Sequence, residues 1–238
     1  MTLRPATRAD LAPLPLEVAP RLLGAVLRTE VAGTVVAVRI TEVEAYHGLG
    51  TGDIADPGSH ARSGLTPRNA TMWGEPGHLY VYLSHGIHSC VNVVCGPSGV
   101  AGGVLLRAGE VIEGRDAASA RRPAARAPRD LARGPGRFGS AVGLRYVDHD
   151  GIDAVTGAVR NGAVARLSLT REAVTDVSTG PRVGVAGIAG TDAFPWRFWL
   201  AGDPTVSAFR WGRGARELQE SGRDAASARQ ADTPSVLD

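Results

Sequence analysis

The sequence predicts a globular α+β protein in which strands outnumber helices and loops are frequent. The hydrophobic fraction of 43% is enough for a buried core, and 238 residues allow one large domain or two small ones. Glycine and proline, with 31 and 15 residues, supply many turns without reaching a low-complexity composition. Runs rich in Val, Ile and Thr recur along the chain, whereas helical spacing is clear in one short segment.

Neither a membrane span nor a secreted, disulfide-built fold is expected. No apolar run approaches the roughly 20 residues that a membrane helix needs. Pro5, Asp10, Pro13 and Pro15 interrupt the N-terminus where a signal segment would be apolar. Two cysteines are too few for a disulfide scaffold, so the expected compartment is the reducing cytoplasm.

The first 75 residues predict a helix, a strand, a loop and a helical turn. Apolar residues at helical spacing indicate a short helix within residues 16–27. Residues 34–46 are rich in Val, Ile and Thr and predict a strand. Glycines make residues 47–66 a long loop, and such loops in compact domains are usually functional or disordered. A Thr-Pro pair then predicts a short helical turn over 66–72.

Residues 78–94 predict a β-hairpin with His85-Gly86 at its tip. The loop length determines which side chains share a face. A two-residue loop would place Tyr82 and Asn92 on opposite faces. An odd loop centred on His85, with Gly86 in the left-handed conformation, would bring four side chains to one face: Tyr80, Tyr82, His88 and Asn92.

Further strands or turns are predicted after the hairpin, and the core ends near residue 211. The segments are 104–107, 144–153, 163–169, 181–185 and 196–200. From residue 212 to 238 the chain is polar, and we expect a mobile tail. The octapeptide GRDAASAR occurs twice, at 114–121 and 222–229, too far apart for a solenoid repeat.

All 26 basic residues are arginines, and the sequence contains no lysine. Schiff-base chemistry on a lysine and a P-loop lysine are therefore excluded. The net charge of +2 is unevenly spread, because residues 115–145 hold eight arginines against Asp116 and Asp130, a net +6. Clustered arginines favour a polyanion such as nucleic acid, and a solvated surface segment is the equally weighted alternative.

Glu42 and Glu44 lie two residues apart at the end of the predicted strand 34–46, so their side chains share a face. Mutual repulsion would raise the pKa of one of them, which suits a general base. On spacing alone, an exposed strand with two solvated acids is the more common explanation.

Three of the four tyrosines, Tyr46, Tyr80 and Tyr82, fall within 40 residues of each other, with His60 between them. They could form a stacking site for a flat, electron-poor ring. Alternating aromatic residues that pack a core are the alternative.

A metal site at the hairpin is not expected. His85, His88, Cys90 and Cys95 contain metal-ligand types, but strand alternation places the two cysteines on opposite faces, and no C-x-x-C pair occurs. His85 at the exposed tip could instead act as a wedge between base pairs, or be ordinary turn chemistry.

Several long motifs, taken in order, resemble the alkyladenine (3-methyladenine) DNA glycosylase family. The matching segments are ITEVEAY (40–46), His60, LTPRNATMW (65–73), PGHLYVYLSHGIHSCVNVV (76–94), GGVLLRAGEVIEG (102–114), GPGRFGSAVGL (134–144), PRVGVAG (181–187) and PWRFWLAGDPTVS (195–207). The resemblance implies one mixed α+β domain over residues 1–211, with a curved antiparallel sheet, flanking helices and a protruding β-hairpin.

The resemblance also implies the reaction, which is base flipping and hydrolysis of the N-glycosidic bond of damaged purines in base excision repair. Glu44 would be the general base, and Arg107 and the backbone at Val183 would help to hold the attacking water. Tyr46, His60 and Tyr82 would enclose the base. Asn92 would obstruct the exocyclic amine of normal guanine, and His85 stands at a wedge position where relatives often have tyrosine.

Without a lysine, the enzyme is expected to lack lyase activity and to leave an intact abasic site. Candidate substrates are 3-methyladenine, 7-methylguanine, hypoxanthine and ethenoadenine. The expected partner is damaged double-stranded DNA, approached from the minor groove, with no cofactor, metal, membrane or obligate protein partner. The resemblance places the protein in the bacterial cytoplasm, at the nucleoid when acting. The alternative is a non-catalytic nucleic-acid-binding module of the same fold, as in formyltransferase C-terminal domains.

Overall fold

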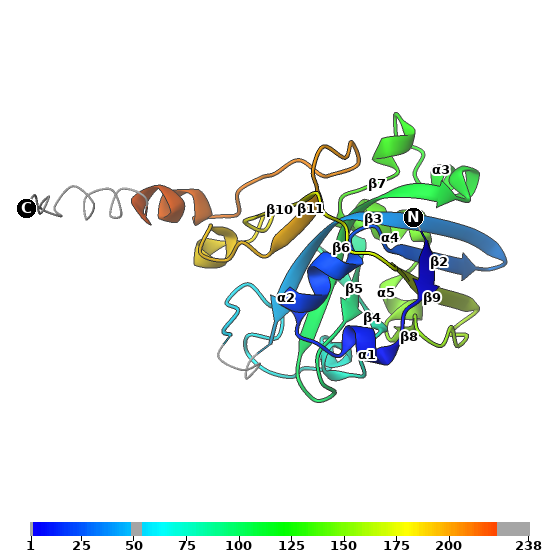
Figure 1. The fold of residues 1–238 in the computed structure, drawn as a ribbon, viewed down its shortest axis with the longest axis horizontal. Helices are drawn as coiled ribbons and strands as arrows, with labels where there is room; N and C mark the ends of the chain where they lie inside the picture. Colours follow the sequence, from blue (N-terminus) through cyan, green and yellow to red (C-terminus); the bar gives the residue numbers. More distant parts are fainter. Residues whose placement is uncertain (1, 49–53, 223–238) are drawn as a thin grey trace, which may run out of the picture.

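A curved antiparallel sheet forms the centre of the computed structural model, which describes residues 2–48 and 54–222 (Figure 1). The strands are β1 (Leu3–Pro5), β2 (Val26–Val31), β3 (Thr34–His47), β4 (His78–Ser84), β5 (His88–Val94), β6 (Gly102–Glu113), β7 (Ala132–Arg133), β8 (Ile152–Asp153), β9 (Ala163–Thr170), β10 (Val177–Gly180) and β11 (Arg197–Leu200). The α-helices are α1 (Arg8–Leu11), α2 (Pro15–Val18), α3 (Arg115–Arg121), α4 (Pro135–Val142) and α5 (Tyr146–His149). The 3₁₀ helices are η1 (Ala19–Leu22), η2 (Ala70–Trp73), η3 (Pro128–Asp130) and η4 (Gly187–Gly190).

The strand β3 is the hub of the sheet. The main order is β1-β9-β2-β3-β6-β5-β4-β8, and every pairing is antiparallel. The first half of β3 pairs with β2, its second half pairs with β11, and nearly its whole length pairs with β6. Predicted strand 34–46 is thus confirmed and is one residue longer. The α+β class with a curved antiparallel sheet is also confirmed.

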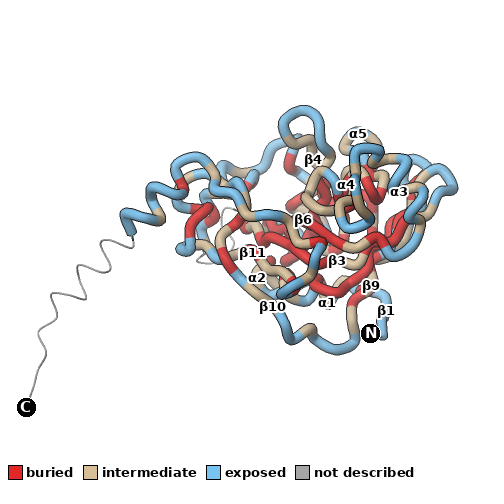
Figure 2. Tube along the Cα trace, turned by 90° about the horizontal axis from the view of Figure 1, so that it is seen from above, coloured by how far each residue is buried: buried red, intermediate tan, exposed pale blue. Residues whose placement is uncertain are grey.

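Alternation along β3 separates the core from a polar row. Val43 and Ala45 belong to the main hydrophobic core, whereas residues 42, 44 and 46 point to the other face. Buried residues concentrate along β3 and β6 in Figure 2, and exposed residues mark the outer loops. The core is contiguous from the N-terminal helices to α4, as expected of a single domain.

A bulge in the β3–β6 ladder lies beside this polar row. Glu42 pairs with Ala108 and Val43 with Leu106, which leaves Arg107 as the extra residue on β6. A bulge re-aims the side chain next to it, and such irregularities are frequent at functional sites. Arg107 therefore reaches the face that carries Glu42 and Glu44.

The hairpin β4–β5 has an odd loop of residues 85–87. Ser84 pairs with His88, Tyr82 with Cys90 and Tyr80 with Asn92. Four predicted side chains therefore share one face: Tyr80, Tyr82, His88 and Asn92. The pairing of Ser84 with His88 centres the loop on Gly86 and not on His85. Both residues adopt positive φ, 50° at His85 and 71° at Gly86.

Helix α4 supports β5 directly after the hairpin loop. Gly139 lies so close to the backbone of Ser89 that a Cβ there would meet the Ser89 carbonyl oxygen, so glycine permits the contact. His88 rests on Gly136 in the first turn of the same helix. One prediction at another position was wrong, because residues 181–185 do not form a strand. The predicted turn over 66–72 is present as a turn over 67–69 that continues into η2, and Asn69 Oδ1 accepts the Thr66 N–H at 2.7 Å.

The predicted helix within residues 16–27 consists of two short pieces, α2 and η1, before β2 begins at Val26. Pro20 removes a backbone donor inside this stretch, which explains the change to a 3₁₀ helix. None of the described helices is both long enough and apolar enough to span a membrane.

The described part of the predicted tail contacts the rest of the chain. Residues 215–222 are helical, Ala215 is buried, and Gln219 donates to Asp192 Oδ2 at 2.6 Å. Residues 223–238, with all but the first residue of the second GRDAASAR copy, lie outside the described residues. The first copy, 114–121, forms a left-handed Gly114 cap followed by α3. The domain boundary at 211 stays a prediction.

His47 predicts a testable pH dependence of stability. Its ring is fully buried against Trp196, with centroids 5.2 Å apart, and neither ring nitrogen has a hydrogen-bond partner among the described residues. Burial, aided by the Arg182 charge, lowers its pKa to about 4. The unfolded chain takes up this proton near pH 6.5, so native stability falls as the pH drops from about 6.5 to about 4.

We expect His47→Leu to stabilise the protein by about 1–2 kcal/mol at pH 7.5, because it removes an unsatisfied buried polar group. The gain should be larger at pH 5, where the wild type also loses the histidine contribution. Urea unfolding of both proteins at the two pH values measures this, and an equal difference at both would contradict the role of His47.

Candidate functional site

One row of side chains crosses five strands at the centre of the sheet. Residues directly opposite each other in neighbouring antiparallel strands share a face. The pairings place one residue from each of β11, β3, β6, β5 and β4 in this row: Arg197, Glu44, Leu105, Asn92 and Tyr80. The sheet itself therefore assembles residues that lie far apart in the sequence.

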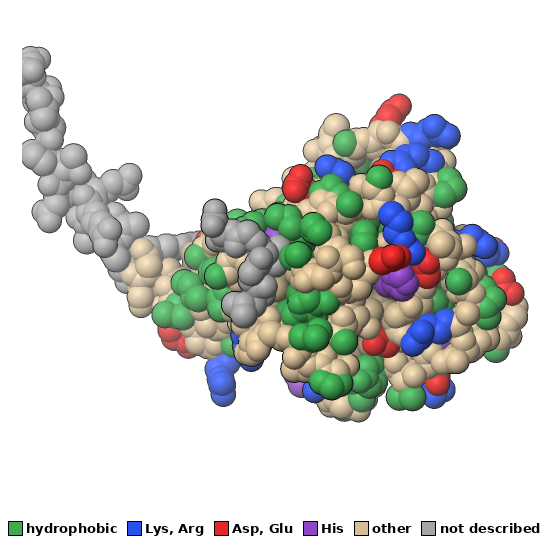
Figure 3. All heavy atoms as spheres, turned by 90° about the horizontal axis from the view of Figure 1, so that it is seen from below, with side chains coloured by type: hydrophobic (Ala, Val, Ile, Leu, Met, Phe, Trp, Pro, Cys, Tyr) green, Lys and Arg blue, Asp and Glu red, His purple; other side chains and the backbone are tan. Residues whose placement is uncertain are grey.

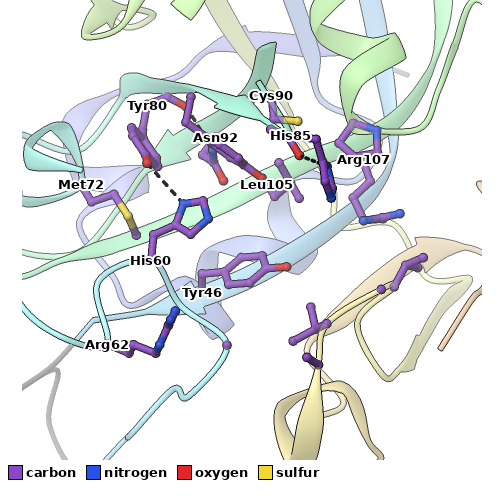
Figure 4. A pocket seen from close by; sticks show the side chains of 18 of the residues that line it. Tyr46, His60, Arg62, Met72, Tyr80, His85, Cys90, Asn92, Leu105 and Arg107 are labelled. Carbon is purple, nitrogen blue, oxygen red and sulfur yellow. Dashed lines mark hydrogen bonds between the residues drawn. The ribbon is translucent and has the colours of Figure 1, made fainter. Parts of the chain in front are cut away.

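A pocket of about 570 Å³ opens over this row (Figure 4). Its volume is in the range of small-molecule sites. Its lining includes all but one of the predicted site residues: Tyr46, His60, Tyr82, His85, Asn92, Arg107 and Val183. Glu44 does not line it. Tyr80, one of the aromatic residues predicted for a stacking site, also lines it, and so does Cys90. Sequence reasoning did not identify the other lining residues: Pro57, Gly58, Arg62, Met72, Ser84, Leu105, Pro135, Gly184, Val185 and Ala186.

Glu44 lies directly behind the pocket wall and is buried. Its Oε1 accepts the backbone N–H of Val183 at 2.7 Å. Its Oε2 accepts the Tyr46 hydroxyl at 2.8 Å and lies 3.2 Å from Nη1 of Arg107. All three partners line the pocket, so the carboxylate is one residue layer from the cavity. The Val183 N–H group is committed to Glu44.

Glu42 is fully buried beside Glu44, and Arg107 bridges the two. Oε1 of Glu42 accepts hydrogen bonds from Nε of Arg107 at 2.9 Å and from Nε of Arg197 at 2.7 Å. Burial alone would raise the pKa of Glu42, but the charges of Arg107 and Arg197 outweigh it and lower the pKa below its usual value. The pKa rise expected from repulsion in one of the two carboxylates does not occur at Glu42, because two arginines compensate the charges.

A second buried ion pair fixes the opposite side of the pocket. Arg182 and Asp56 are both fully buried and form a two-pronged pair, with N–O distances of 2.7 and 2.8 Å. The guanidinium carbon of Arg182 lies 4.5 Å from the ring centre of Tyr46 and 5.0 Å from that of Trp196. Arg182 is not part of the pocket lining, so it supports the Tyr46 ring from outside the cavity.

The aromatic walls are neutral. His60 meets Tyr82 edge-on at 4.5 Å and faces Tyr80, whose hydroxyl lies 3.3 Å from His60 Nδ1. In Figure 4 the His60 ring lies between those of Tyr80 and Tyr46. Burial, with the charges of Arg68 and Arg62, lowers the pKa of His60, so the ring is uncharged at neutral pH. Burial raises the pKa of Tyr46 well above its usual value, with Glu44 adding to the rise.

Asn92 forms the floor of the pocket beside Leu105. Its side-chain amide donates from Nδ2 to the carbonyl oxygen of Tyr80 at 3.0 Å. This bond fixes the orientation of the amide group against the hairpin backbone, because a buried donor needs a partner. The position of Asn92 is therefore set by β4, its neighbour in the sheet.

The hairpin tip stands at the mouth of the pocket. His85 is exposed, lines the pocket and has its Nδ1 3.0 Å from the Ser84 hydroxyl. Ile87, on the other side of the loop, is 72% exposed. The tip therefore presents an exposed apolar residue beside an exposed histidine.

A basic hollow of about 330 Å³ adjoins the pocket and shares Arg107 and Val183 with it. Arg133, Arg137 and Arg210 line its outer part, and the last two are exposed. Through Arg137 it continues into a further hollow that is lined by Arg122 and Arg126. Part of the arginine-rich block 115–145 therefore lines a row of hollows that begins at the pocket. On the face drawn in Figure 3, by contrast, acidic and basic side chains are interspersed.

The two cysteines lie on opposite faces of the hairpin, as strand alternation predicts. Cys90 lines the pocket and Cys95 belongs to the main core, and both are buried thiols. Burial raises the pKa of both. Among the described residues, no group of three or more metal-ligand side chains is close enough together to hold an ion.

Sequence reasoning gave no role to Arg182, Arg197 and Asp56. Both arginines stand next to apolar or aromatic residues, in PRVGV and PWRFW, and a charge in such a run is a signal of burial with a partner. Asp56 lies in the glycine-rich loop and carries no comparable signal.

Known proteins resemble this chain over most of its length. The model of the family described as "Methylpurine-DNA glycosylase (MPG)" matches residues 10–204. A protein of Leifsonia xyli subsp. xyli is 52% identical over 199 residues, which cover 82% of this chain and 88% of the relative. A protein of Nocardia farcinica is 50% identical over 82% of this chain and 87% of the relative. A protein of Streptomyces avermitilis is 48% identical over 87% of this chain and 92% of the relative. All three carry the name "Putative 3-methyladenine DNA glycosylase".

The buried pair of Arg182 and Asp56 predicts a large effect on stability. Asp56→Asn leaves the Arg182 charge uncompensated in the interior, so we expect a loss of about 3–5 kcal/mol of unfolding free energy. Asp148→Asn is the matched control, because Asp148 pairs with the exposed Arg145 and should cost less than about 1 kcal/mol. Urea unfolding measures both. Similar losses in the two variants would show that the buried pair is not special.

Proposed function

Since the chain belongs to the methylpurine-DNA glycosylase family, we propose that it removes alkylated purines from duplex DNA by hydrolysing the N-glycosidic bond. The observation that carries this proposal is the buried Glu44 carboxylate, which Tyr46, Arg107 and Val183 hold directly behind the wall of an aromatic pocket. The target base lies inside the duplex stack, so the reaction requires that the nucleotide be flipped into this pocket.

Hydrogen-bond accounting indicates where the attacking water binds. An ionised carboxylate offers about four acceptor positions. Val183 occupies one on Oε1, while Tyr46 and Arg107 occupy those on Oε2. The remaining position is on Oε1. There a water can donate to Glu44, which takes its proton as the water attacks the sugar carbon.

The chemistry of the pocket favours cationic purines. Methylation at N3 or N7 gives the base a positive charge, so it leaves readily and needs no proton from the enzyme. A neutral His60 and the faces of Tyr46 and Tyr82 stabilise such a cation without repelling it. 3-Methyladenine and 7-methylguanine are therefore the proposed main substrates. Hypoxanthine and ethenoadenine, which also need protonation to leave, are the slower ones.

Contacts with DNA are proposed on two sides of the pocket. The exposed hairpin tip, with His85 and Ile87, would enter the minor groove and fill the gap that the flipped base leaves. The basic hollow lined by Arg133, Arg137 and Arg210 would hold backbone phosphates next to the flipped nucleotide. Asn92 on the pocket floor would collide with the exocyclic amine of normal guanine.

The buried Glu44–Arg107 pair argues against a non-catalytic nucleic-acid-binding module, because binding alone does not require a buried carboxylate behind the pocket. The absence of lysine supports a monofunctional enzyme, since lyase chemistry in glycosylases uses an amine to form a Schiff base. The product is then an abasic site in an unbroken strand.

Glu44→Gln tests the proposed reaction. The amide keeps the shape but cannot take a proton from water, so single-turnover release of 7-methylguanine should fall by about 10²–10⁴-fold. Base release from methylated duplex DNA is measured by chromatography. The strand should break only after treatment with hot alkali. Glu110→Gln, at the half-exposed pair with Arg39, is the matched control. A Glu44→Gln enzyme as fast as wild type, or an inactive wild type, would refute the proposal.

His85→Tyr tests the wedge. A larger ring fills more of the gap in the duplex, so the variant should bind abasic-site DNA several-fold more tightly than wild type. A gel-shift titration with an abasic-site duplex and an undamaged duplex measures the difference. Equal or weaker binding to the abasic duplex would remove His85 from this role.

A further inference from the structure

Glu42 is a buried carboxylate to which the proposed reaction gives no part. It is fully inaccessible to solvent and accepts four hydrogen bonds. Two come from Nε of Arg107 and Nε of Arg197, and two from the backbone N–H and the hydroxyl of Ser207, at 2.7 and 2.9 Å. A carboxylate so completely bound is expensive to desolvate, so its place beside the site calls for a reason.

Arg107 shows what Glu42 does. Its Nε is bound to Glu42 and its Nη2 lies 3.3 Å from the Ser207 hydroxyl, so only Nη1 remains for Glu44, at 3.2 Å. A guanidinium that is free to turn would present two parallel N–H groups to a carboxylate. Glu42 and Ser207 prevent this arrangement, and Glu44 receives one long contact in its place.

We propose that Glu42 is a positioning residue that restricts Arg107 to a single contact with Glu44 and thereby keeps Glu44 basic enough to accept a proton from water. This inference rests on the proposed function. A two-pronged ion pair would stabilise the ionised form of Glu44 strongly and weaken it as a base. A missing Arg107 would leave two buried carboxylates side by side.

The local charge count supports this role. Two carboxylates, Glu42 and Glu44, are balanced by Arg107 and Arg197, and the lowered pKa of Glu42 agrees with a permanent negative charge there. The groups that face Glu44 come from every neighbouring element: Glu42 and Tyr46 on β3, Arg107 on β6, Arg197 on β11, Tyr82 on β4 and Arg182 after β10. Of these, Glu42, Arg197 and Arg182 do not line the pocket. Arg182 lies against the Tyr46 ring in the pocket wall, so Glu42 and Arg197 are the residues exchanged in the test.

The test is the pH profile of 7-methylguanine release under single-turnover conditions. This cationic base needs no leaving-group proton, so the acid limb of the profile reports the general base. Glu42→Gln removes a negative charge and frees Arg107 to pair fully with Glu44. We expect the plateau rate to fall about tenfold and the midpoint of the acid limb to move down by about one pH unit.

Arg197→Gln changes the local charge in the opposite direction. It tests the proposed role of Glu42 even if the Glu42→Gln variant does not fold. It removes a positive charge and leaves Arg107 as the one arginine paired with Glu42. The midpoint of the acid limb should therefore move up by a similar amount. The double variant restores the charge balance, and its midpoint should return toward that of wild type. Glu110→Gln, on the same strand as Arg107 but half-exposed, should move neither rate nor midpoint.

The failures are distinguishable. A wild type that releases no methylated purine refutes the proposed function. An active wild type whose midpoint is unchanged in both Glu42→Gln and Arg197→Gln refutes only the positioning role, even if the plateau rates fall, because a merely structural role lowers the rate without moving the midpoint. Midpoints that move in the same direction in the two single variants also overturn it.

Discussion

The compensation of buried charge around Arg107 is the constraint on which the rest of the site depends. Two carboxylates on one face of β3 would repel each other in a dry interior, and each would lose its hydration. A guanidinium between them, at 2.9 Å from one and 3.2 Å from the other, makes their burial tolerable. The bulge opposite Glu42 directs the Arg107 side chain to this position. The irregular backbone of β6 therefore makes the charge compensation possible.

A second buried ion pair supports the pocket next to this cluster of Glu42, Glu44 and Arg107. Arg182 and Asp56 join the loop after β3 to the segment after β10, and the same guanidinium lies against Tyr46. Tyr46 in turn donates to Glu44. The aromatic wall and the carboxylate are therefore held by one connected set of hydrogen bonds and ion pairs, and neither can shift alone. Such mutual support is what a preorganised site needs, because little rearrangement is then left for the reaction.

The proposed DNA-binding surface differs in kind. The hairpin tip and the outer arginines of the basic hollow are exposed, so their contacts await the partner. His85 and Gly86 in left-handed conformation set the turn, while α4 holds the start of β5 next to the loop through Gly139 and Gly136. An exposed apolar and polar tip on a supported strand suits insertion into a groove, and the arginines suit phosphates, which need charge more than shape.

Local rules in the sequence determined much of this protein. Period two placed residues 42, 44 and 46 on one face, separated Cys90 from Cys95, and limited the hairpin to two registers. The motifs indicated the family, and the absence of lysine excluded Schiff-base chemistry on a lysine side chain. Tertiary structure decided which arginine meets which carboxylate. Arg107, Arg197 and Ser207 reach Glu42 across 65, 155 and 165 residues of chain, and Asp56 meets Arg182 across 126. Propensity and spacing act over a few residues, whereas these pairs exist because an antiparallel sheet and one bulge bring distant strands together and because a buried charge is stable only beside its partner.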